Sequence, residues 1–380
     1  MKRVLVLNGP NLDLLGKREP EIYGRTTIAE LVTMMRGWGS DLGIEVDHFQ
    51  SNHEGELIER IHAAAGSQDG LIINAGALSH YSRAIEDALR SVAPPAVEVH
   101  ISNIRRREAW RRKSVIGPAC VYTIYGRGLS GYRWALRHLA YRTHATFSTV
   151  SYGPFPDQVG DLRKLSPSSM SLAVLVHGGL WRDEWTRDTM DGLAVALAEV
   201  GYATWNLEYR RIGSGGGWPE SFDDVATALS NAEDVTGIGA SQTFVVGHSA
   251  GGTMALWSTG RAARLHVVVG LAAITDLVRA ERDGLGDSAI PQMVGRRQPK
   301  PSDYSPFHRL PNGTPLLLAS GTHDGLVPLD YGREFVAAAG EAGDEVEHLE
   351  LDCGHLALIE PGGEPWQAVM SRLRSRIPPL

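Results

Sequence analysis

Short apolar segments alternate strictly with helical patterns over the first 142 residues. The first segment, residues 4–7, is too short for a helix and is ended by Asn-Gly-Pro, so it is predicted to be a buried strand. Five strand–helix units in this order predict a flavodoxin-like, doubly wound five-stranded parallel sheet. The expected strands are 4–7, 44–50, 71–73, 96–102 and 119–125, and the expected helices are 26–42, one carrying Leu57 and Ile61, 79–92, a basic helix after Asn103, and 130–142.

The loop after the first strand, residues 8–24, reads NGPNLDLLGKREPEIYG. It follows the carboxyl end of a strand, which is where open parallel sheets bind ligands. It carries Asn11, Arg18 and Tyr23. A tyrosine hydroxyl titrates near ~10, so Tyr23 needs a nearby cation such as Arg18 to act as a base at neutral pH. The alternative is an ordinary surface loop with an incidental arginine.

The fourth expected strand, 96–102, is polar on one face. Glu98, His100 and Ser102 alternate with Val97, Val99 and Ile101, whereas parallel strands covered on both faces are normally apolar throughout. His100 oriented by Glu98 fits a general acid or base. A buried structural histidine is the alternative.

Further polar residues are expected at the same rim of the sheet. Asn74 ends a strand and His80 begins a helix, while Arg107 and Arg111 lie four residues apart after the polar strand. One of these guanidinium groups could bind a carboxylate through a bidentate pair of hydrogen bonds. Six basic residues between Arg105 and Lys113 could equally form a solvated surface.

Residues 1–142 resemble type II 3-dehydroquinate dehydratase in five motifs that occur in register. The motifs are NGPNLDLLGKREPEIYG, QSNHEGELIERIH, INAGALSHYSRAIEDAL, EVHISNIRRREAWRR and GRGLSGYRWAL. The resemblance implies a trans-dehydration of 3-dehydroquinate to 3-dehydroshikimate through an enolate, with no cofactor and no metal. It also implies trimers grouped into dodecamers.

The resemblance also assigns roles to single residues. It implies that Tyr23, favoured as phenolate by Arg18, abstracts the proton next to the carbonyl, and that Asn11 helps to hold the enolate oxygen through a water. It implies that His100, oriented by Glu98, protonates the departing hydroxyl. The residues implied in substrate binding are Asn74, His80, Asp87, Ile101, Ser102 and Arg111, of which Arg111 binds the carboxylate and Asp87 reaches a neighbouring subunit's site.

The second half contains the pentapeptide Gly-His-Ser-Ala-Gly at 247–251, between an expected strand at 243–246 and a helical pattern. This context predicts a nucleophile elbow with Ser249 exposed at its tip. Asp324 and His355 follow later strands, 316–319 and 346–351, and would supply the orienting carboxylate and the base. Asp276 is the rival acid, and His323 and His266 are rival bases.

An oxyanion hole is expected beside Ser249. His177-Gly178-Gly179-Leu180-Trp181 follows an expected strand at 172–176, and the amides of Ala250 and of Gly179 or Leu180 are the candidate donors. The third glycine of the HGGG type is missing, since Leu180 occupies its place.

Residues 148–380 are similar to α/β-hydrolases of the esterase and kynurenine formamidase group, in which HGG-x-W precedes GHSAGG. The resemblance implies a serine hydrolase acting on an ester or amide, and a non-catalytic assembly module is the alternative. Other predictions here are a leading pair of strands before residue 165, a helix at 185–200 and a strand at 202–207. Four aromatic residues either line a pocket or belong to the core, namely Trp181, Trp185, Tyr209 and Trp218. The glycine run 213–217 is either a mobile flap or a flexible loop.

Length and charge support two domains, 1–143 and 144–380, joined in the polar passage 143–150. Before Thr143 there are 19 basic and 15 acidic residues, and after it 18 basic and 29 acidic. The acidic half argues against nucleic acid as a partner, so small-molecule substrates and a homo-oligomer are expected. Two cysteines, Cys120 and Cys353, imply no disulfide framework and a cytoplasmic location. No signal peptide is expected, since the apolar run after Lys2 and Arg3 is only four residues long. No membrane partner is expected, since no apolar stretch approaches ~20 residues.

Overall fold

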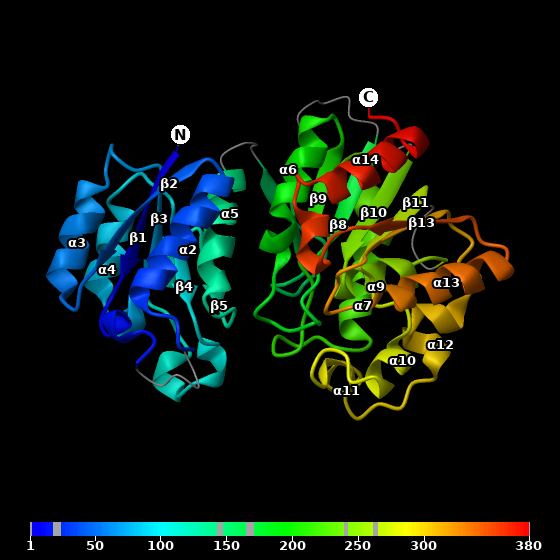
Figure 1. The fold of residues 1–380 in the computed structure, drawn as a ribbon, viewed down its shortest axis with the longest axis horizontal. Helices are drawn as coiled ribbons and strands as arrows, with labels where there is room; N and C mark the ends of the chain where they lie inside the picture. Colours follow the sequence, from blue (N-terminus) through cyan, green and yellow to red (C-terminus); the bar gives the residue numbers. More distant parts are fainter. Residues whose placement is uncertain are drawn as a thin grey trace. The chain divides into compact units, whose positions relative to one another are not determined.

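A computed structural model describes residues 2–17, 24–142, 147–164, 171–238, 242–260 and 265–379. The chain divides into two compact units, Met1–Thr143 and His144–Leu380 (Figure 1). Within the described residues, no helix combines the length and the apolar character that crossing a membrane requires.

The first unit is a five-stranded parallel sheet in the order β2-β1-β3-β4-β5, which confirms the flavodoxin-like prediction. Helices α2 and α5 pack together, as do α3 and α4, so helices cover both faces of the sheet (Figure 1). The strands are β1 (Lys2–Asn8), β2 (Ile44–Gln50), β3 (Gly70–Asn74), β4 (Ala96–His100) and β5 (Tyr122–Tyr125). The helices are α2 (Ile28–Asp41), α3 (Glu54–Ala63), α4 (Arg83–Arg90) and α5 (Ser130–Arg142), and the 3-10 turns are η1 (Leu12–Leu14), η2 (Gly76–His80), η3 (Ile104–Arg106), η4 (Ala109–Arg111) and η5 (Gly117–Ala119).

Three boundaries in this unit differ from the sequence prediction. The basic segment after Asn103 is not an α-helix but two single turns, η3 and η4, because the backbone at Arg107 is extended and separates them. The expected helix 79–92 is likewise divided, since Ser82 caps a new helix by accepting a hydrogen bond from the Ile85 amide. β4 ends at His100, so residues 101 and 102 lie beyond the strand.

The second unit is an eight-stranded sheet in the order β13-β12-β11-β10-β8-β9-β7-β6. Only the pairs β6–β7 and β7–β9 are antiparallel, so the expected leading strands form its edge. The strands are β6 (Ser148–Ser151), β7 (Val159–Arg163), β8 (Ser171–Val176), β9 (Ala203–Leu207), β10 (Gln242–His248), β11 (Val267–Leu271), β12 (Leu316–Gly321) and β13 (Val346–Leu351). β6 begins inside the passage that the sequence assigned to the join, and β11 was not predicted.

Helices surround this second sheet (Figure 1). The expected helix 185–200 is a 3-10 turn, η6 (Arg187–Met190), followed by α6 (Asp191–Glu199). The remaining helical elements are α7 (Glu220–Ser230), α8 (Ala232–Thr236), α9 (Ala250–Trp257), α10 (Leu277–Arg282), α11 (Ala289–Val294), α12 (Pro301–Tyr304), η7 (Pro306–Arg309), α13 (Leu329–Glu341), η8 (His355–Ile359) and α14 (Glu364–Arg376).

The aromatic side chains expected to line a pocket belong mainly to the core of this unit. Trp181, Tyr209 and Trp218 are buried members of one apolar cluster. The Trp181 ring stacks on the Phe222 ring with centroids 6.2 Å apart, and the Trp218 ring meets the Phe222 ring edge to face at 5.0 Å. Of the two alternatives that the sequence leaves open, the structure therefore favours the core for these three residues.

The glycine run 213–217 forms a packed turn. A Cβ atom at Gly216 would lie 2.1 Å from the Arg210 carbonyl oxygen, and one at Gly217 would lie 2.8 Å from that of Met293. The Trp218 amide donates to the same Met293 oxygen at 2.8 Å. Glycine is needed here for close backbone approach, so the structure supports neither a flap nor a flexible loop.

Replacing Leu71 by alanine should destabilise the first unit selectively. Leu71 is fully buried on β3, the central strand, and a buried leucine truncated to alanine costs about 2–5 kcal/mol. Hydrogen exchange of first-unit peptides during a urea titration measures this loss. Met34→Ala is the control, because Met34 is 39% exposed on α2 and should change stability by less than about 0.5 kcal/mol. Equal effects of both variants would contradict the assignment of the core.

Candidate functional site

A cavity opens in the first unit beyond the carboxyl ends of β1, β3 and β4. Seven residues predicted from the sequence line it, namely Asn11, Asn74, His80, His100, Ile101, Ser102 and Arg111. The other lining residues are Pro10, Leu12, Leu14, Leu15, Gly76, Ala77, Ile104 and Arg107. The expected rim of the sheet is thus a concave, mostly preformed site.

Glu98 and His100 form a buried pair on one face of β4. His100 Nε2 lies 2.9 Å from Glu98 Oε1, and Glu98 also accepts hydrogen bonds from Ser114 Oγ at 2.7 Å and Thr123 Oγ1 at 3.2 Å. Burial alone would raise the pKa of Glu98, but His100 and these hydroxyls outweigh it and lower that pKa. An ionised Glu98 fixes Nε2 of His100 as a donor and leaves Nδ1 for a ligand.

The tautomer of His80 follows from its backbone contact. Its Nδ1 lies 2.9 Å from the Lys113 carbonyl oxygen, and a carbonyl only accepts, so Nδ1 donates. Burial lowers the pKa of His80, and the nearby His100 and Arg111 lower it further. The neutral ring then presents Nε2 as an acceptor, which fits a ligand hydroxyl.

Two arginines bring positive charge to the cavity. Arg107 Nη1 donates to Ser102 Oγ at 3.3 Å. The Arg111 guanidinium lies 4.2 Å from the centroid of the Trp110 ring, and its Nε is 3.4 Å from Glu108 Oε2. Guanidinium groups bind carboxylates through parallel hydrogen bonds, so this side of the cavity favours an anionic ligand.

A buried hydrogen-bond chain, which sequence reasoning missed, orients Asn74. Tyr132 on α5 donates to Asn8 Oδ1 at 2.5 Å and accepts from Asn74 Nδ2 at 2.9 Å. Asn8 Nδ2 in turn lies 3.0 Å from His48 Nε2. Because its NH₂ group is occupied, Asn74 presents its oxygen on the other side, toward the Gly76 amide at 3.3 Å. The one sequence signal for this series of hydrogen bonds is the polar residue Asn8 at the end of an apolar strand.

Four predicted residues need separate mention. Arg18 and Tyr23 lie outside the described residues. Asn11 has a left-handed backbone, with φ of 68°, and its amide donates to Asn52 Oδ1 at 2.8 Å. Asp87 lies on an exposed face of α4 and does not line the cavity.

In the second unit, Ser249 occupies a strained turn between β10 and α9. Its backbone has φ of 54° and ψ of −122°, which non-glycine residues rarely adopt. A Cβ atom at Gly247 would lie 2.3 Å from the Gly251 oxygen, and one at Gly251 would lie 2.2 Å from the Val176 oxygen. These contacts explain the two glycines and agree with a nucleophile elbow.

His355 and Asp324 form the pair expected to serve Ser249. His355 Nδ1 lies 2.7 Å from Asp324 Oδ2, and Asp324 Oδ1 accepts from the Leu326 and Val327 amides at 2.8 and 2.9 Å. Burial alone would raise the pKa of Asp324, but the His355 contact and these amides lower it. The His355 ring lies 4.6 Å from that of His248, which directly precedes Ser249. In the described part of the chain, Ser249 Oγ makes no hydrogen bond to His355, and resting triads are often loose in this way.

Two of the three rival residues are engaged elsewhere. Asp276 caps α10 by accepting from the Val278 and Arg279 amides. His323 forms an exposed ion pair with Asp352. The structure therefore favours Asp324 and His355.

The loop after β8 packs directly on the elbow. A Cβ atom at Gly178 would lie 2.9 Å from Ser249 Cβ. Gly179 and Leu180 have φ of 108° and 53°, so Leu180 adopts the strained conformation expected of the missing glycine. Among the described residues, the amides of Gly179, Leu180 and Ala250 meet no acceptor, which leaves them free for an oxyanion.

The model of the family "Dehydroquinase class II" matches residues 2–140. A 3-dehydroquinate dehydratase from Thermotoga maritima is 53% identical over 137 residues, which are 36% of this chain and 94% of the relative. The chain belongs to the class II dehydroquinase family.

The dehydroquinase domain is fused to an α/β-hydrolase domain. The model of the prolyl oligopeptidase family (peptidase S9) matches residues 191–359. A truncated carbohydrate esterase from gut microbiota aligns with a TM-score of 0.54 and 14% identity, over 62% of this chain and 97% of the esterase. A hormone-sensitive lipase from a metagenome library aligns with a TM-score of 0.52 and 20% identity, over 62% and 87%. At these identities the two structures establish the fold.

The hydrolase domain should lose stability as the pH falls through the range of a normal histidine. Burial, and then the charge of His355, lowers the pKa of His248 from 6.5 to about 3. Between these values the unfolded chain binds more protons, so the contribution of His248 is complete above pH 6.5 and is lost progressively below it. The urea midpoint, followed by tryptophan fluorescence, should fall between pH 7 and pH 5, and less steeply in His248→Gln. His323→Gln, at an exposed position, should keep the full slope, and equal slopes in all three proteins would refute the assignment.

Proposed function

We propose that the chain is a bifunctional enzyme. Its dehydroquinase domain converts 3-dehydroquinate to 3-dehydroshikimate by trans-dehydration, and its hydrolase domain cleaves an ester or amide. The observation that carries the first assignment is the buried Glu98–His100 pair, 2.9 Å apart, in a cavity that also contains Arg111. An imidazole held by a carboxylate can transfer a proton, and the guanidinium can hold the substrate carboxylate.

The reaction begins with removal of a proton next to the substrate's ketone. We assign this step to Tyr23, with Arg18 favouring its phenolate, as the family resemblance implies. Lowering the pKa of a phenol by two or three units requires roughly 3–4 kcal/mol of differential interaction, which nearby guanidinium groups can supply in a site shielded from water. Asn11, which lines the cavity, would help to stabilise the enolate oxygen through a water.

The second step is loss of the hydroxyl as water. His100 is assigned as the proton donor, because the Glu98 carboxylate stabilises the protonated imidazole from which the departing hydroxyl takes its proton. His80 Nε2 and the Asn74 oxygen would accept hydrogen bonds from substrate hydroxyls, and Ile101 and Ser102 complete the binding site.

The exposed position of Asp87 on α4 fits a contact with another subunit. We propose the trimer-based assembly, up to a dodecamer, that the resemblance implies, with Asp87 reaching a partner's site. The reaction could serve aromatic biosynthesis through the shikimate pathway or the breakdown of quinate, and a cytoplasmic location remains a prediction.

Two substitutions test the dehydratase scheme. Tyr23→Phe should keep the fold and lose most activity, because only the phenolic oxygen is removed. Glu98→Gln should lower kcat by roughly 10²-fold with little change in KM, because it weakens a group used in the transition state. Product formation is followed by the ultraviolet absorbance of the conjugated acid. Tyr81→Phe, at a 61% exposed position, is the control. Full activity in Tyr23→Phe would rule out the proposed base.

The hydrolase assignment rests on the strained Ser249 next to the Asp324–His355 pair. Histidine would take the serine proton, and the amides of Ala250 and of Gly179 or Leu180 would stabilise the tetrahedral oxyanion. Formamidase-like and esterase-like substrates both fit this chemistry. Quinate or shikimate esters would link the two domains, since their hydrolysis releases acids related to the substrate of the first domain.

Labelling and turnover together test the second domain. The protein should react with a fluorophosphonate at Ser249 and should hydrolyse at least one of p-nitrophenyl acetate, N-formylkynurenine and chlorogenate-type esters. Ser249→Ala should abolish labelling and hydrolysis while leaving dehydratase activity unchanged. If the wild type is neither labelled nor active on any of the three, the domain is an assembly module.

A further inference from the structure

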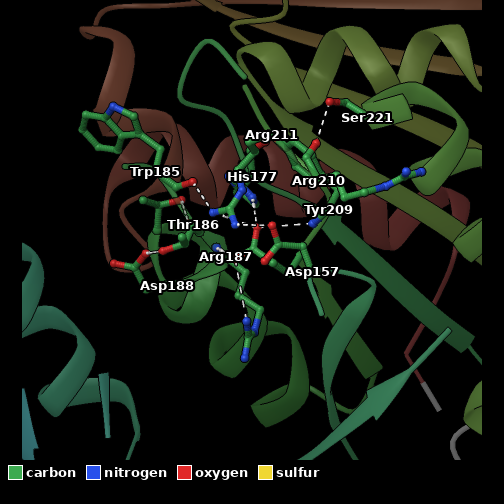
Figure 2. Close-up of polar contacts among 12 residues, drawn as sticks. Asp157, His177, Trp185, Thr186, Arg187, Asp188, Tyr209, Arg210, Arg211 and Ser221 are labelled. Carbon is green, nitrogen blue, oxygen red and sulfur yellow. Dashed lines mark hydrogen bonds and ion pairs between the residues drawn. The ribbon is translucent and has the colours of Figure 1, made fainter. Parts of the chain in front are cut away.

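A buried ionic cluster surrounds His177, the first residue of the loop after β8 in the hydrolase domain. Figure 2 shows His177 together with Asp157, Arg187 and Arg211. His177 follows β8 and Glu208 follows β9, and the parallel register that pairs Val176 with Leu207 brings the two side chains together. His177 is fully buried and Glu208 is 3% exposed. Burying an ionisable side chain costs free energy unless it is paired with a group of opposite charge.

The hydrogen bonds of His177 determine its protonation. Its Nε2 lies 2.9 Å from Glu208 Oε1, and its Nδ1 lies 2.7 Å from the Gly178 carbonyl oxygen. Burial alone would raise the pKa of Glu208, but Arg211 and His177 lower it to about 2, so the carboxylate only accepts. A carbonyl oxygen also only accepts. Both ring nitrogens must therefore donate, which requires an imidazolium.

Glu208 and His177 belong to a larger ionic cluster. Glu208 also contacts two guanidinium groups, Arg211 at 3.2 Å and Arg187 at 3.7 Å. These pair in turn with Asp157 at 3.1 Å and Asp161 at 2.8 Å. With a charged His177, the three cations and three carboxylates of this cluster balance.

Tyr209 adds a further contact to the same ring. It stacks on His177 with ring centroids 4.3 Å apart, and its hydroxyl donates to the His177 carbonyl oxygen at 2.9 Å. The face of an aromatic ring attracts a cation, so this stacking also favours the imidazolium.

The Nδ1 contact links this charge to the oxyanion hole. The Gly178 carbonyl and the Gly179 amide belong to one peptide group, so a hydrogen bond accepted by the carbonyl polarises the amide and strengthens it as a donor. Gly178 packs on Ser249, where its added Cβ would lie 2.9 Å from Ser249 Cβ. The polarised peptide is therefore next to the nucleophile.

We propose that His177 is a permanently charged positioning residue, held as imidazolium by Glu208, which strengthens the Gly179 amide as an oxyanion donor. This inference rests on the proposed hydrolase function. His177 does not touch the substrate but acts through the peptide between Gly178 and Gly179. The hydrolase site would then combine two histidines with different tasks, since His355 transfers protons and His177 supplies a fixed charge.

Nitrogen NMR of the full chain with ¹⁵N-labelled histidine tests the charge without reference to activity. The His177 signals, identified as those missing in His177→Gln, should show a proton on both ring nitrogens from pH 6 to pH 8. A ring with one bare nitrogen at pH 7 would overturn the proposal. The charge is read from the wild-type protein, and only the assignment uses His177→Gln, so this measurement does not depend on whether Glu208→Gln folds.

Kinetics of Glu208→Gln test the catalytic consequence. Glutamine can still accept the Nε2 hydrogen bond but carries no charge, so the ring should lose one proton and kcat for p-nitrophenyl acetate should fall roughly 10-fold, with KM unchanged. A purely structural role would lower the active fraction, measured by fluorophosphonate titration, and leave kcat per active site constant, which would refute the proposal. Asp224→Asn is the control, because Asp224 is a buried carboxylate paired with Arg210, away from His177. If the wild type hydrolyses nothing, the proposed function fails together with this role, whereas the NMR result still decides the charge.

Discussion

The pairing of a buried carboxylate with an imidazole at the carboxyl end of parallel strands underlies the three sites described above. Burial penalises each charge alone, and the contact between the two offsets that penalty. Glu98–His100, Asp324–His355 and Glu208–His177 lie 2.9, 2.7 and 2.9 Å apart. In the first two pairs the carboxylate selects which ring nitrogen donates, whereas in the third pair both nitrogens donate. In all three, the position of the nitrogen that does not face the carboxylate decides the role. That nitrogen faces a ligand cavity in the first case, is expected to face a serine in the second and contacts a carbonyl in the third.

The sequence predicts these sites to very different degrees. The polar face of β4 could be recognised because Glu98 and His100 interrupt an apolar pattern at period two, and the elbow because small residues flank Ser249 between a strand and a helix. Both signals are local. The partners Ser114, Thr123 and Tyr132 approach from distant segments, and no periodicity predicts such contacts. Glu208 was missed for the same reason, since its importance depends on the register between β8 and β9.

The errors of sequence reasoning have a common physical origin. Arg107 and Arg111 have helical spacing, but an extended residue separates two short turns, so local conformation overrides spacing. Trp181 and Trp218 lie near a catalytic motif in the sequence and yet fill the core, because large aromatic side chains stabilise a domain most when they are fully buried. Within the glycine run, Gly216 and Gly217 allow close approach to the backbone of Arg210 and Met293.

Each sheet draws all its strands from its own stretch of chain, β1–β5 from the first unit and β6–β13 from the second. During translation, which proceeds from the amino terminus at about 5–20 residues per second, every strand of the first sheet has left the ribosome before most of the second sheet exists. The hydrolase sheet must wait for β13 and for His355, which follow every strand of the first sheet. The first sheet can therefore form while the second is still incomplete, so the order of synthesis separates the times at which the two units fold.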